Sequence, residues 1–411
     1  MNLPLRASSK GTICIVRHGF YPSELNVRRE AEALREDGYG VDVVCLRKRG
    51  EAAHEVVDGI DVRRLPIEHR RGNIGRYLFE YNAFFAVASI ELVKLHLRHQ
   101  LRAVQVNTMP DYLVFCALPV RAAGAKVVLH VHEPMPELFG TLFDKMRHRP
   151  LHLVIKWAQR LSLAYADRAL TVTTEMRQNL GRRGADLRKI TVILNVPDDR
   201  MFRPERYAHL EERVARAKED DRRAGVFRLL CHGTIEQRYG QDLVVGAVAR
   251  LRNAIPGIQF RFMGQGEHLP AVLAKAEELG VSSHVRYLGF VPFETMIEEI
   301  LCADLVIVPM RRNPYSVLIH TNKMYEYMTL GRPIISSRLK SVCSYFPEDT
   351  LLYFEPDDEG SLAERVFYAF SHPEEVQLRI HRMTELYKTY CWEHEKGKYL
   401  GVYDALLGHE R

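Results

Sequence analysis

The stretch Thr321-Asn-Lys-Met-Tyr-Glu-Tyr-Met-Thr-Leu-Gly-Arg-Pro-Ile-Ile335 decides how the fold of this chain is interpreted. It predicts a loop, then a short helix that carries Lys323 and Glu326, then a Gly-Arg-Pro turn into a buried strand. Because Lys323 and Glu326 are three residues apart, they share one face of the helix. Thr321 and Asn322 stand at the N-cap, ahead of backbone N–H groups that have no partner within a helix.

The start of this helix suits a nucleotide. A helix N-terminus beside a lysine attracts phosphate, and a glutamate one turn further on can accept hydrogen bonds from both hydroxyls of a ribose. The pattern therefore favours phosphates at Lys323 and a ribose at Glu326. It also suits an amphipathic helix closed by a turn, with both charged side chains solvated.

Apolar runs alternate with helical patterns through both halves of the chain. Buried strands are expected at 12–16, 41–46, 103–106, 126–131, 169–173 and 190–194, and again at 227–231, 258–263, 285–288, 305–308, 333–336 and 351–354. Helices are expected at 23–37, 76–98, 111–123, 151–166 and 175–183, and then at 241–253, 269–279, 293–301 and 362–370. Each half is therefore expected to be a doubly wound Rossmann-like α/β domain, and 411 residues suit two such domains.

Charge and cysteine content narrow the class of protein. Residues 1–200 hold 31 Lys+Arg against 22 Asp+Glu, or +9, which leaves −3 of the total +6 for the rest. A basic N-terminal half suits an anionic acceptor or membrane surface, and it also suits ordinary solubility charge. Nucleic acid is not expected, because no basic helix with base-reading residues is present. The seven cysteines are scattered, and no signal peptide or membrane span is visible, so we expect a reduced, cytoplasmic protein.

The stretch at 321–335 resembles the donor-binding signature of family 4 glycosyltransferases. That family has the GT-B fold, in which two Rossmann-like domains face a central cleft. Six other segments carry the resemblance: Val16-Arg-His-Gly-Phe-Tyr-Pro22, His130-Val-His-Glu-Pro-Met-Pro-Glu137, His232-Gly-Thr-Ile-Glu-Gln-Arg-Tyr-Gly-Gln-Asp242, Met263-Gly-Gln-Gly-Glu267, Tyr287-Leu-Gly-Phe-Val-Pro292 and Tyr390-Cys-Trp-Glu-His-Glu-Lys396.

The resemblance implies three regions. An acceptor-binding domain is expected over 1–197 and a nucleotide-sugar-binding domain over 198–388, because 195–200 indicates a linker. A terminal helix over 389–411 is expected to return to the N-terminal domain.

In the second domain, the resemblance implies a set of donor-binding residues. Many members hold the donor diphosphate with an arginine and a lysine after the first strand of this domain. Thr234 and Tyr239 stand there instead, so Arg238 is the substitute cation. Two further segments would approach the nucleotide with their backbone. The expected donor-binding residues are Gly233, Arg238, Gly264, Gly266, Phe290, Val291, Thr321, Asn322, Lys323 and Glu326.

In the first domain, His18 and Gly19 follow the first strand and are expected to line the sugar pocket. His132 and Glu133 follow another strand and are expected to face the sugar or the acceptor. Asn107 is also expected to face the acceptor, and the reason is only that it stands at the end of a strand. The expected catalytic residues are His132, Arg238 and Lys323.

The sequence departs from the pattern of glycosyltransferases in two ways, which concern the donor sugar and a metal ion. Family members often carry a glutamate near the sugar hydroxyls, with seven residues between it and the one that matches Glu326, and Leu318 stands at that position. Backbone groups of residues 316–320 are the expected replacement. No Asp-x-Asp motif occurs, so we expect no metal and no cofactor, and cations would stabilise the leaving diphosphate.

The resemblance implies transfer of a sugar, UDP-linked, to an acceptor with retention at the anomeric carbon, in the synthesis of cell-envelope polysaccharide or glycolipid. We expect a lipid-linked acceptor at the inner membrane face, because residues 69–89 join Arg70, Arg71 and Arg76 to an aromatic-rich helix. A core helix with a solvated basic loop is the alternative there. For the whole chain, a nucleotide-sugar epimerase of the same fold and a non-catalytic nucleotide-sugar-binding subunit stay open.

Overall fold

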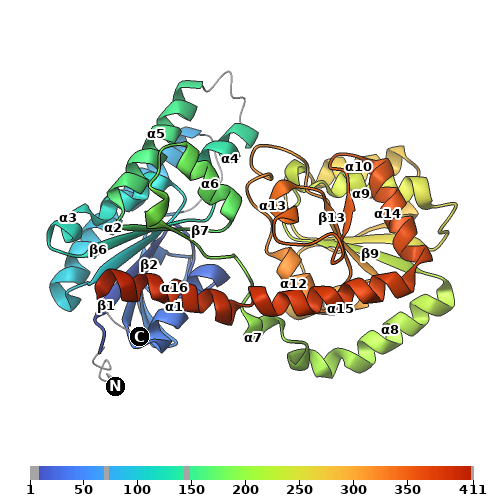
Figure 1. Ribbon diagram of the computed structural model, residues 1–411, viewed down its shortest axis with the longest axis horizontal. Helices are drawn as coiled ribbons and strands as arrows, with labels where there is room; N and C mark the ends of the chain where they lie inside the picture. The colour runs from blue at the N-terminus through green and yellow to red at the C-terminus, as the bar shows by residue number, and fades with distance from the viewer. Residues whose placement is uncertain (1–8, 69–73, 143–148, 409–411) are drawn as a thin grey trace. The chain divides into compact units, whose positions relative to one another are not determined.

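The computed structural model describes residues 9–68, 74–142 and 149–408. They form two units, each a largely parallel sheet covered by helices (Figure 1). The first unit comprises the described residues up to Asn195 and those from Glu393 onward, and the second is Val196–Trp392. Two Rossmann-like α/β units confirm the predicted fold class.

The first unit contains an eight-stranded sheet in the order β3-β4-β2-β1-β5-β6-β7-β8. All neighbours are parallel except β3 and β4, which form an antiparallel hairpin. The strands are β1 (Thr12–Arg17), β2 (Gly40–Leu46), β3 (His54–Val57), β4 (Ile60–Leu65), β5 (Ala103–Asn107), β6 (Lys126–Val131), β7 (Arg168–Thr171) and β8 (Ile190–Val192). The helices are α1 (Leu25–Glu36), α2 (Ile74–His99), η1 (Asp111–Ala117), α3 (Leu118–Ala122), α4 (Met135–Leu142), α5 (Arg149–Tyr165), α6 (Thr174–Arg182), η2 (Leu187–Lys189) and α16 (Trp392–Leu407).

The second unit contains a six-stranded parallel sheet in the order β11-β10-β9-β12-β13-β14. Its strands are β9 (Phe227–His232), β10 (Ile258–Met263), β11 (Val285–Tyr287), β12 (Leu305–Val308), β13 (Ile334–Ser337) and β14 (Leu352–Phe354). Its helices are α7 (Asp199–Phe202), η3 (Pro204–Leu210), α8 (Glu211–Ala224), η4 (Gln237–Tyr239), α9 (Gln241–Leu251), α10 (Leu269–Glu278), η5 (Ser282–His284), α11 (Phe293–Cys302), α12 (Lys323–Thr329), α13 (Lys340–Cys343), α14 (Glu359–Ser371) and α15 (Pro373–Tyr390).

The strand orders mark one point in each sheet where ligands are expected. The order reverses between β1 and β5 in the first unit and between β9 and β12 in the second. Open α/β sheets bind ligands at the carboxyl ends of the strands beside such a reversal. His18 and Asn107 stand at this place in the first unit, and His232 and Gly233 stand there in the second.

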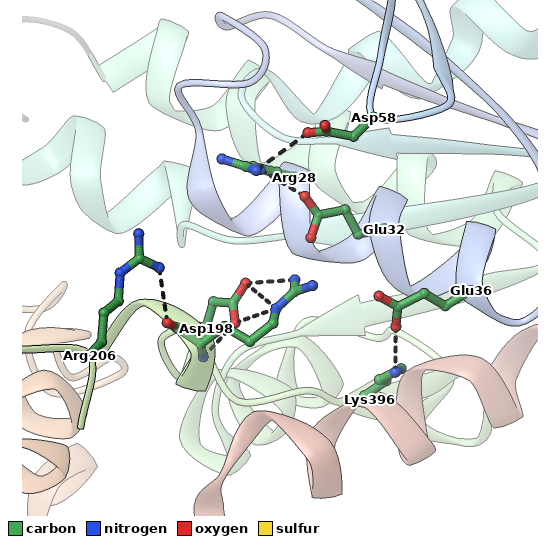
Figure 2. A network of polar contacts seen from close by, with 8 residues as sticks. Arg28, Glu32, Glu36, Asp58, Asp198, Arg206 and Lys396 are labelled. Atoms are coloured by element: carbon green, nitrogen blue, oxygen red, sulfur yellow. Dashed lines mark hydrogen bonds and ion pairs between the residues drawn. The ribbon is translucent and has the colours of Figure 1, made fainter. Parts of the chain in front are cut away.

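The terminal helix α16 is part of the first unit. The hydroxyl groups of Tyr399 and Tyr403, one turn apart, both donate to the Gln105 Oε1 atom inside the unit, from Tyr399 at 2.8 Å. Lys396 Nζ lies 2.7 Å from Glu36 Oε2 on α1 (Figure 2). Buried hydrogen bonds and a surface ion pair therefore attach α16 to β5 and α1.

Two further properties concern the helices and the cysteines of the chain. Within the described residues, no helix is long and apolar enough to cross a membrane. All seven cysteines are free thiols, and five of them are buried.

A pair of aspartates on neighbouring strands predicts a pH-dependent stability. Asp42 on β2 is the register partner of Asp61 on β4. Burial, together with the Asp61 charge, raises the pKa of Asp42 from 3.8 to about 7. The folded chain therefore retains a proton that the unfolded chain releases between these pKa values, so this contribution to stability is lost as pH rises towards 7. We expect Asp42→Asn, which stays neutral, to be more stable than the parent at pH 8.

The gap between variant and parent in free energy of unfolding should narrow as the pH is lowered to 5. Denaturant unfolding at both pH values measures it. Asp58→Asn, which changes an exposed carboxylate on the neighbouring β3–β4 hairpin, is the matched control and should show no such trend. An Asp42→Asn gap of equal size at both pH values would refute the shifted pKa.

Candidate functional site

Helix α12 turns two charged side chains outward at the carboxyl edge of the second sheet. Its apolar and aromatic residues are buried, whereas Lys323 and Glu326 are only partly buried and share one face. The helix begins without a side-chain cap, since Asn322 makes no cap hydrogen bond. The Met324 N–H donates instead to the Thr321 carbonyl at 3.2 Å. The predicted helix start is present, but its N-cap is made by backbone alone.

Glu326 is held in place by a histidine that the sequence did not single out. His232 Nε2 lies 2.8 Å from Glu326 Oε2, and His232 Nδ1 lies 2.7 Å from the Tyr327 hydroxyl. Burial raises the pKa of Tyr327 well above its usual value, so the phenol keeps its proton. Both bonds are satisfied when the Tyr327 hydroxyl donates to His232 Nδ1 and the His232 Nε2–H donates to Glu326. One carboxylate oxygen of Glu326 is thereby fixed, and Oε1 is left to meet a ligand.

The two predicted cations meet at one aromatic ring. Lys323 Nζ lies 4.8 Å from the centroid of the Tyr239 ring, and the Arg238 guanidinium carbon lies 4.9 Å from it. Arg238 also pairs with the Glu236 carboxylate and faces the Tyr315 ring. Tyr239 stands where family members often have a lysine. Its ring contacts both Lys323 and Arg238, so it positions these two cations by cation–π contact.

Gly233 provides the space that Lys323 needs. Its φ is +102°, and a Cβ added there would lie 2.3 Å from Lys323 Cε. A side chain at this position would displace the lysine stem. The predicted donor residue Gly233 thus acts through the placement of Lys323.

Gly264 and Gly266 allow two loops to touch. A Cβ at Gly264 would lie 1.8 Å from the Gly233 carbonyl oxygen, and one at Gly266 would lie 1.9 Å from that of Ile235. The glycines are therefore required by packing between the loops after β9 and β10. Their approach to a nucleotide stays a prediction.

The third predicted segment adjoins this turn. The Gly264 N–H donates to the Gly289 carbonyl at 2.9 Å, and the Tyr287 hydroxyl donates to the Gly264 carbonyl at 2.7 Å. Phe290 follows directly, with 77% of its surface exposed, and Val291 is partly buried. The structure therefore joins this segment to the glycine turn, while base recognition by it stays a prediction.

Several polar groups of the segment around Leu318 are already hydrogen-bonded to other residues of the second unit. The Ser341 hydroxyl lies 2.7 Å from the Ser316 carbonyl and 2.9 Å from that of Ile319. His320 Nε2 bonds to the Tyr325 hydroxyl at 2.7 Å. These contacts reduce the number of groups in 316–320 that could replace the missing glutamate.

In the first unit, His18 packs against α2. Its Nε2 lies 2.9 Å from Glu80 Oε1, both side chains are at most 5% exposed, and its ring contacts those of Tyr81 and Phe84. A Cβ at Gly19 would overlap Glu24, which binds Arg17. Both residues stand at the predicted place, but the His18 ring is engaged by Glu80, and its contact with a sugar stays a prediction.

Asn107 belongs to a buried network. Its Nδ2 donates to Glu30 Oε2 at 2.9 Å, and its Oδ1 accepts from Gln105 Nε2 at 2.6 Å. The side chain is fully buried, with both amide groups used. This corrects the expectation that Asn107 faces an acceptor, because a strand-end position does not say whether a side chain points outward or inward.

His132 lies beside that network. Its ring stacks on that of His130 with centroids 3.8 Å apart, and its backbone N–H donates to Thr108 Oγ1 at 3.1 Å. Burial, with the neighbouring His130, lowers the pKa of His132 well below 6.5, so the imidazole is neutral near pH 7. Glu133 follows it and is partly buried. A neutral histidine at a strand end can hydrogen-bond a hydroxyl group.

Within the part of the chain that the structure describes, Glu30, His130 and His132 form the group that could hold a metal ion, with ligand atoms within 4.8 Å of one another. The fit is poor. The two rings are inclined by only 28°, so their in-plane lone pairs run side by side and do not converge on one point. Glu30 Oε1 already meets His130 Nδ1 at 3.0 Å, and its Oε2 accepts from Gln105 and Asn107.

Comparison with known proteins agrees with this geometry. Residues 24–195 match the family model described as "Glycosyl transferase 4-like domain", and residues 226–372 match "Glycosyl transferases group 1". A 2-deoxystreptamine glucosyltransferase of Streptomyces kanamyceticus is 24% identical over 94% of this chain and 100% of its own length.

Solved structures show the same fold. Sucrose-phosphate synthase of Thermosynechococcus elongatus matches 97% of this chain and 100% of its own, with a TM-score of 0.78 at 16% identity. The Anabaena protein HepE, solved with UDP and glucose, matches 96% of this chain and 100% of its own, with a TM-score of 0.70 at 13% identity.

Proposed function

Since the chain is a glycosyltransferase of the GT-B type, we propose that it transfers a sugar from a UDP-linked donor to an acceptor with retention of anomeric configuration. The observation that carries this proposal is that Lys323 and Glu326 share one face of α12, which follows β12 beside the β9–β12 strand-order reversal. HepE binds UDP, and the Streptomyces relative is named a glucosyltransferase, which supports a UDP-linked hexose.

The proposed chemistry assigns a task to each side chain. The Glu326 carboxylate, fixed by His232, accepts hydrogen bonds from the ribose hydroxyls. Lys323 and Arg238, which both contact the Tyr239 ring, are assigned to stabilise the negative charge that grows on the diphosphate. The bond from the anomeric carbon to the β-phosphate oxygen breaks, and a bond to the acceptor oxygen forms on the same face. The acceptor proton passes to the departing phosphate, so no separate protein base is required.

A donor panel tests this proposal. UDP-glucose, GDP-mannose and ADP-glucose are compared by thermal shift, because a ligand at about 100 times its Kd adds roughly 2.7 kcal/mol of stability. A shift with the UDP-linked sugar alone supports the proposal, and a shift with none of the three rejects it. Conversion of the donor sugar without any acceptor would identify an epimerase, and binding without turnover would identify a non-catalytic subunit. The matches to glycosyltransferases do not favour either alternative.

We expect activity to survive chelation. The groups proposed to face the diphosphate are Lys323 and Arg238, and the Glu30, His130 and His132 cluster fits a metal poorly. UDP release is measured with and without EDTA. Complete loss in EDTA, restored by Mn²⁺ or Mg²⁺, would contradict an account that relies on cationic side chains alone.

The proposed acceptor is an amphiphile at an anionic membrane face, in glycolipid or envelope polysaccharide synthesis. Of the three arginines behind this prediction, Arg70 and Arg71 lie outside the described residues. Arg76 is exposed at the start of α2, on the same face as the exposed side chain of Phe79 three residues further on, and Leu78 is also exposed in this turn. Basic and apolar groups side by side support interfacial attachment. The remainder of α2 is partly core, since Phe84 is fully buried.

A further inference from the structure

Helix α5 presents apolar side chains to solvent on a second surface of the first unit. Leu153, Val154, Trp157 and Leu161 are each 50–60% exposed. At 3.6 residues per turn they span about 100° of the helix circumference, so they form one stripe, called here the α5 stripe. A surface helix ordinarily carries polar residues on its outer side.

The opposite side of α5 attaches the helix to its unit. Ile155 and Leu163 are buried there. Gln159 Nε2, on the same side, donates to Asp111 Oδ2 of η1 at 2.9 Å, and at the end of the helix the Tyr165 ring packs on Phe115 with centroids 4.9 Å apart. The fold of the unit therefore does not require the α5 stripe to be apolar.

The charges on α5 are of one sign. Its sequence, RPLHLVIKWAQRLSLAY, has no Asp or Glu. Lys156 and Arg160 border the stripe, and the Arg160 guanidinium lies 5.6 Å from the centroid of the Trp157 ring. Lys189 adds a third cation at the end of the helix, where its Nζ lies 3.1 Å from the Ala166 carbonyl.

The course of the chain relates the α5 stripe to the candidate site. Strands β6 and β7 are parallel, so the connection through α4 and α5 leads from the carboxyl edge of the sheet back to its amino edge. The first turns of α5, with Leu153 and Val154, therefore lie toward the edge that carries His132.

We propose that the α5 stripe inserts into the interface of an anionic lipid bilayer. The apolar side chains enter the boundary of the acyl chains, Trp157 takes the interfacial position that indole rings favour, and Lys156 and Arg160 reach the phosphates. A bilayer suits this surface better than a second copy of the chain, because an isologous contact would bring like charges together. This surface is distinct from the start of α2, and it deepens the proposed membrane contact without involving the donor site.

Tryptophan fluorescence of the full chain provides the test. The protein has two tryptophans, and Trp392 is only 5% exposed, so Trp157 reports on the surface. We expect phosphatidylglycerol-containing vesicles to shift the emission to shorter wavelength and protect it from acrylamide. Pure phosphatidylcholine vesicles should do much less, and high salt should reverse the effect.

Variants locate the contact. Lys156→Glu with Arg160→Glu, and separately Leu153→Ser with Leu161→Ser, should each lower vesicle partitioning about tenfold or more. Leu378→Ser, at a position on α15 with a similar exposed fraction of 47%, is the control and should partition like the parent. Phe79→Ser, which changes the exposed apolar side chain on α2, shows whether α2 or α5 makes the membrane contact.

Several results would overturn the proposal. One is a Trp157 that is already shielded from acrylamide in the free protein, and another is vesicle binding that is lost only in Phe79→Ser. The others are no binding to anionic vesicles at low salt, or a dimer that the Leu153→Ser, Leu161→Ser double variant dissociates. UDP affinity, measured by calorimetry, should be equal in all of these variants. Failure of the membrane surface is therefore distinguishable from failure of the proposed transferase.

Discussion

Replacing Lys323 or Arg238 by alanine is expected to lower kcat about 10²-fold or more while nucleoside affinity changes little. Both cations contact the Tyr239 ring and are assigned to the diphosphate, where negative charge grows as the sugar departs. Removing one such contact to a transition state commonly costs a factor of this size. Steady-state kinetics with the donor, together with calorimetry using uridine, measures the two effects separately.

Substitutions of exposed cations elsewhere in the second unit show whether the loss of any positive charge lowers kcat. Lys340→Ala and Arg286→Ala, both exposed in the second unit, should retain the parent kcat. A Lys323 or Arg238 variant that loses only acceptor affinity would move that side chain out of the donor site.

Glu326→Ala is expected to weaken UDP binding about tenfold or more in a folded protein. A charge-assisted hydrogen bond contributes about 1.5–3 kcal/mol, and a tenfold change in Kd corresponds to about 1.4 kcal/mol. Glu326→Gln keeps the shape and removes the charge, so its affinity should fall between those of parent and alanine variant. Calorimetry with UDP measures all three proteins. An unchanged Kd in Glu326→Ala would reject the ribose assignment.

Two variants of His232 test whether its contact with Glu326 supports UDP binding. It holds Glu326 Oε2 at 2.8 Å, so His232→Gln, which retains a donor group, should preserve UDP affinity better than His232→Phe. Equal affinities for the two variants would show that the carboxylate needs no partner for its position.

The strands could be predicted because most of them are buried on both faces of parallel sheets. Such strands are continuous apolar runs, as in β1, and their positions agree with the expected ones within two residues. The β3–β4 hairpin was missed because β3 is an exposed edge strand with no apolar run. Asp58-Gly59, both at positive φ, was the available signal, since this pair favours a hairpin turn. Helix α8 was missed because it buries no residue.

The site could be predicted only where its parts are close in sequence. Lys323 and Glu326 share a face because helical spacing requires it. His232 is 94 residues from Glu326, so only the folded sheet brings them together. The network around Glu30, Gln105 and Tyr399 joins three distant segments and was invisible for the same reason. Asn107 was assigned by its strand-end position, which does not reveal the direction of the side chain.

A double-mutant cycle on the ribose contact tests the central claim most directly. UDP and 2′,3′-dideoxy-UDP are titrated into the parent protein and into Glu326→Ala. If Glu326 holds the ribose hydroxyls, the parent loses about tenfold in affinity when the hydroxyls are removed, and the variant loses nothing further. An equal loss in both proteins would show that the hydroxyls contact another group, and the nucleotide would not lie on α12 as proposed.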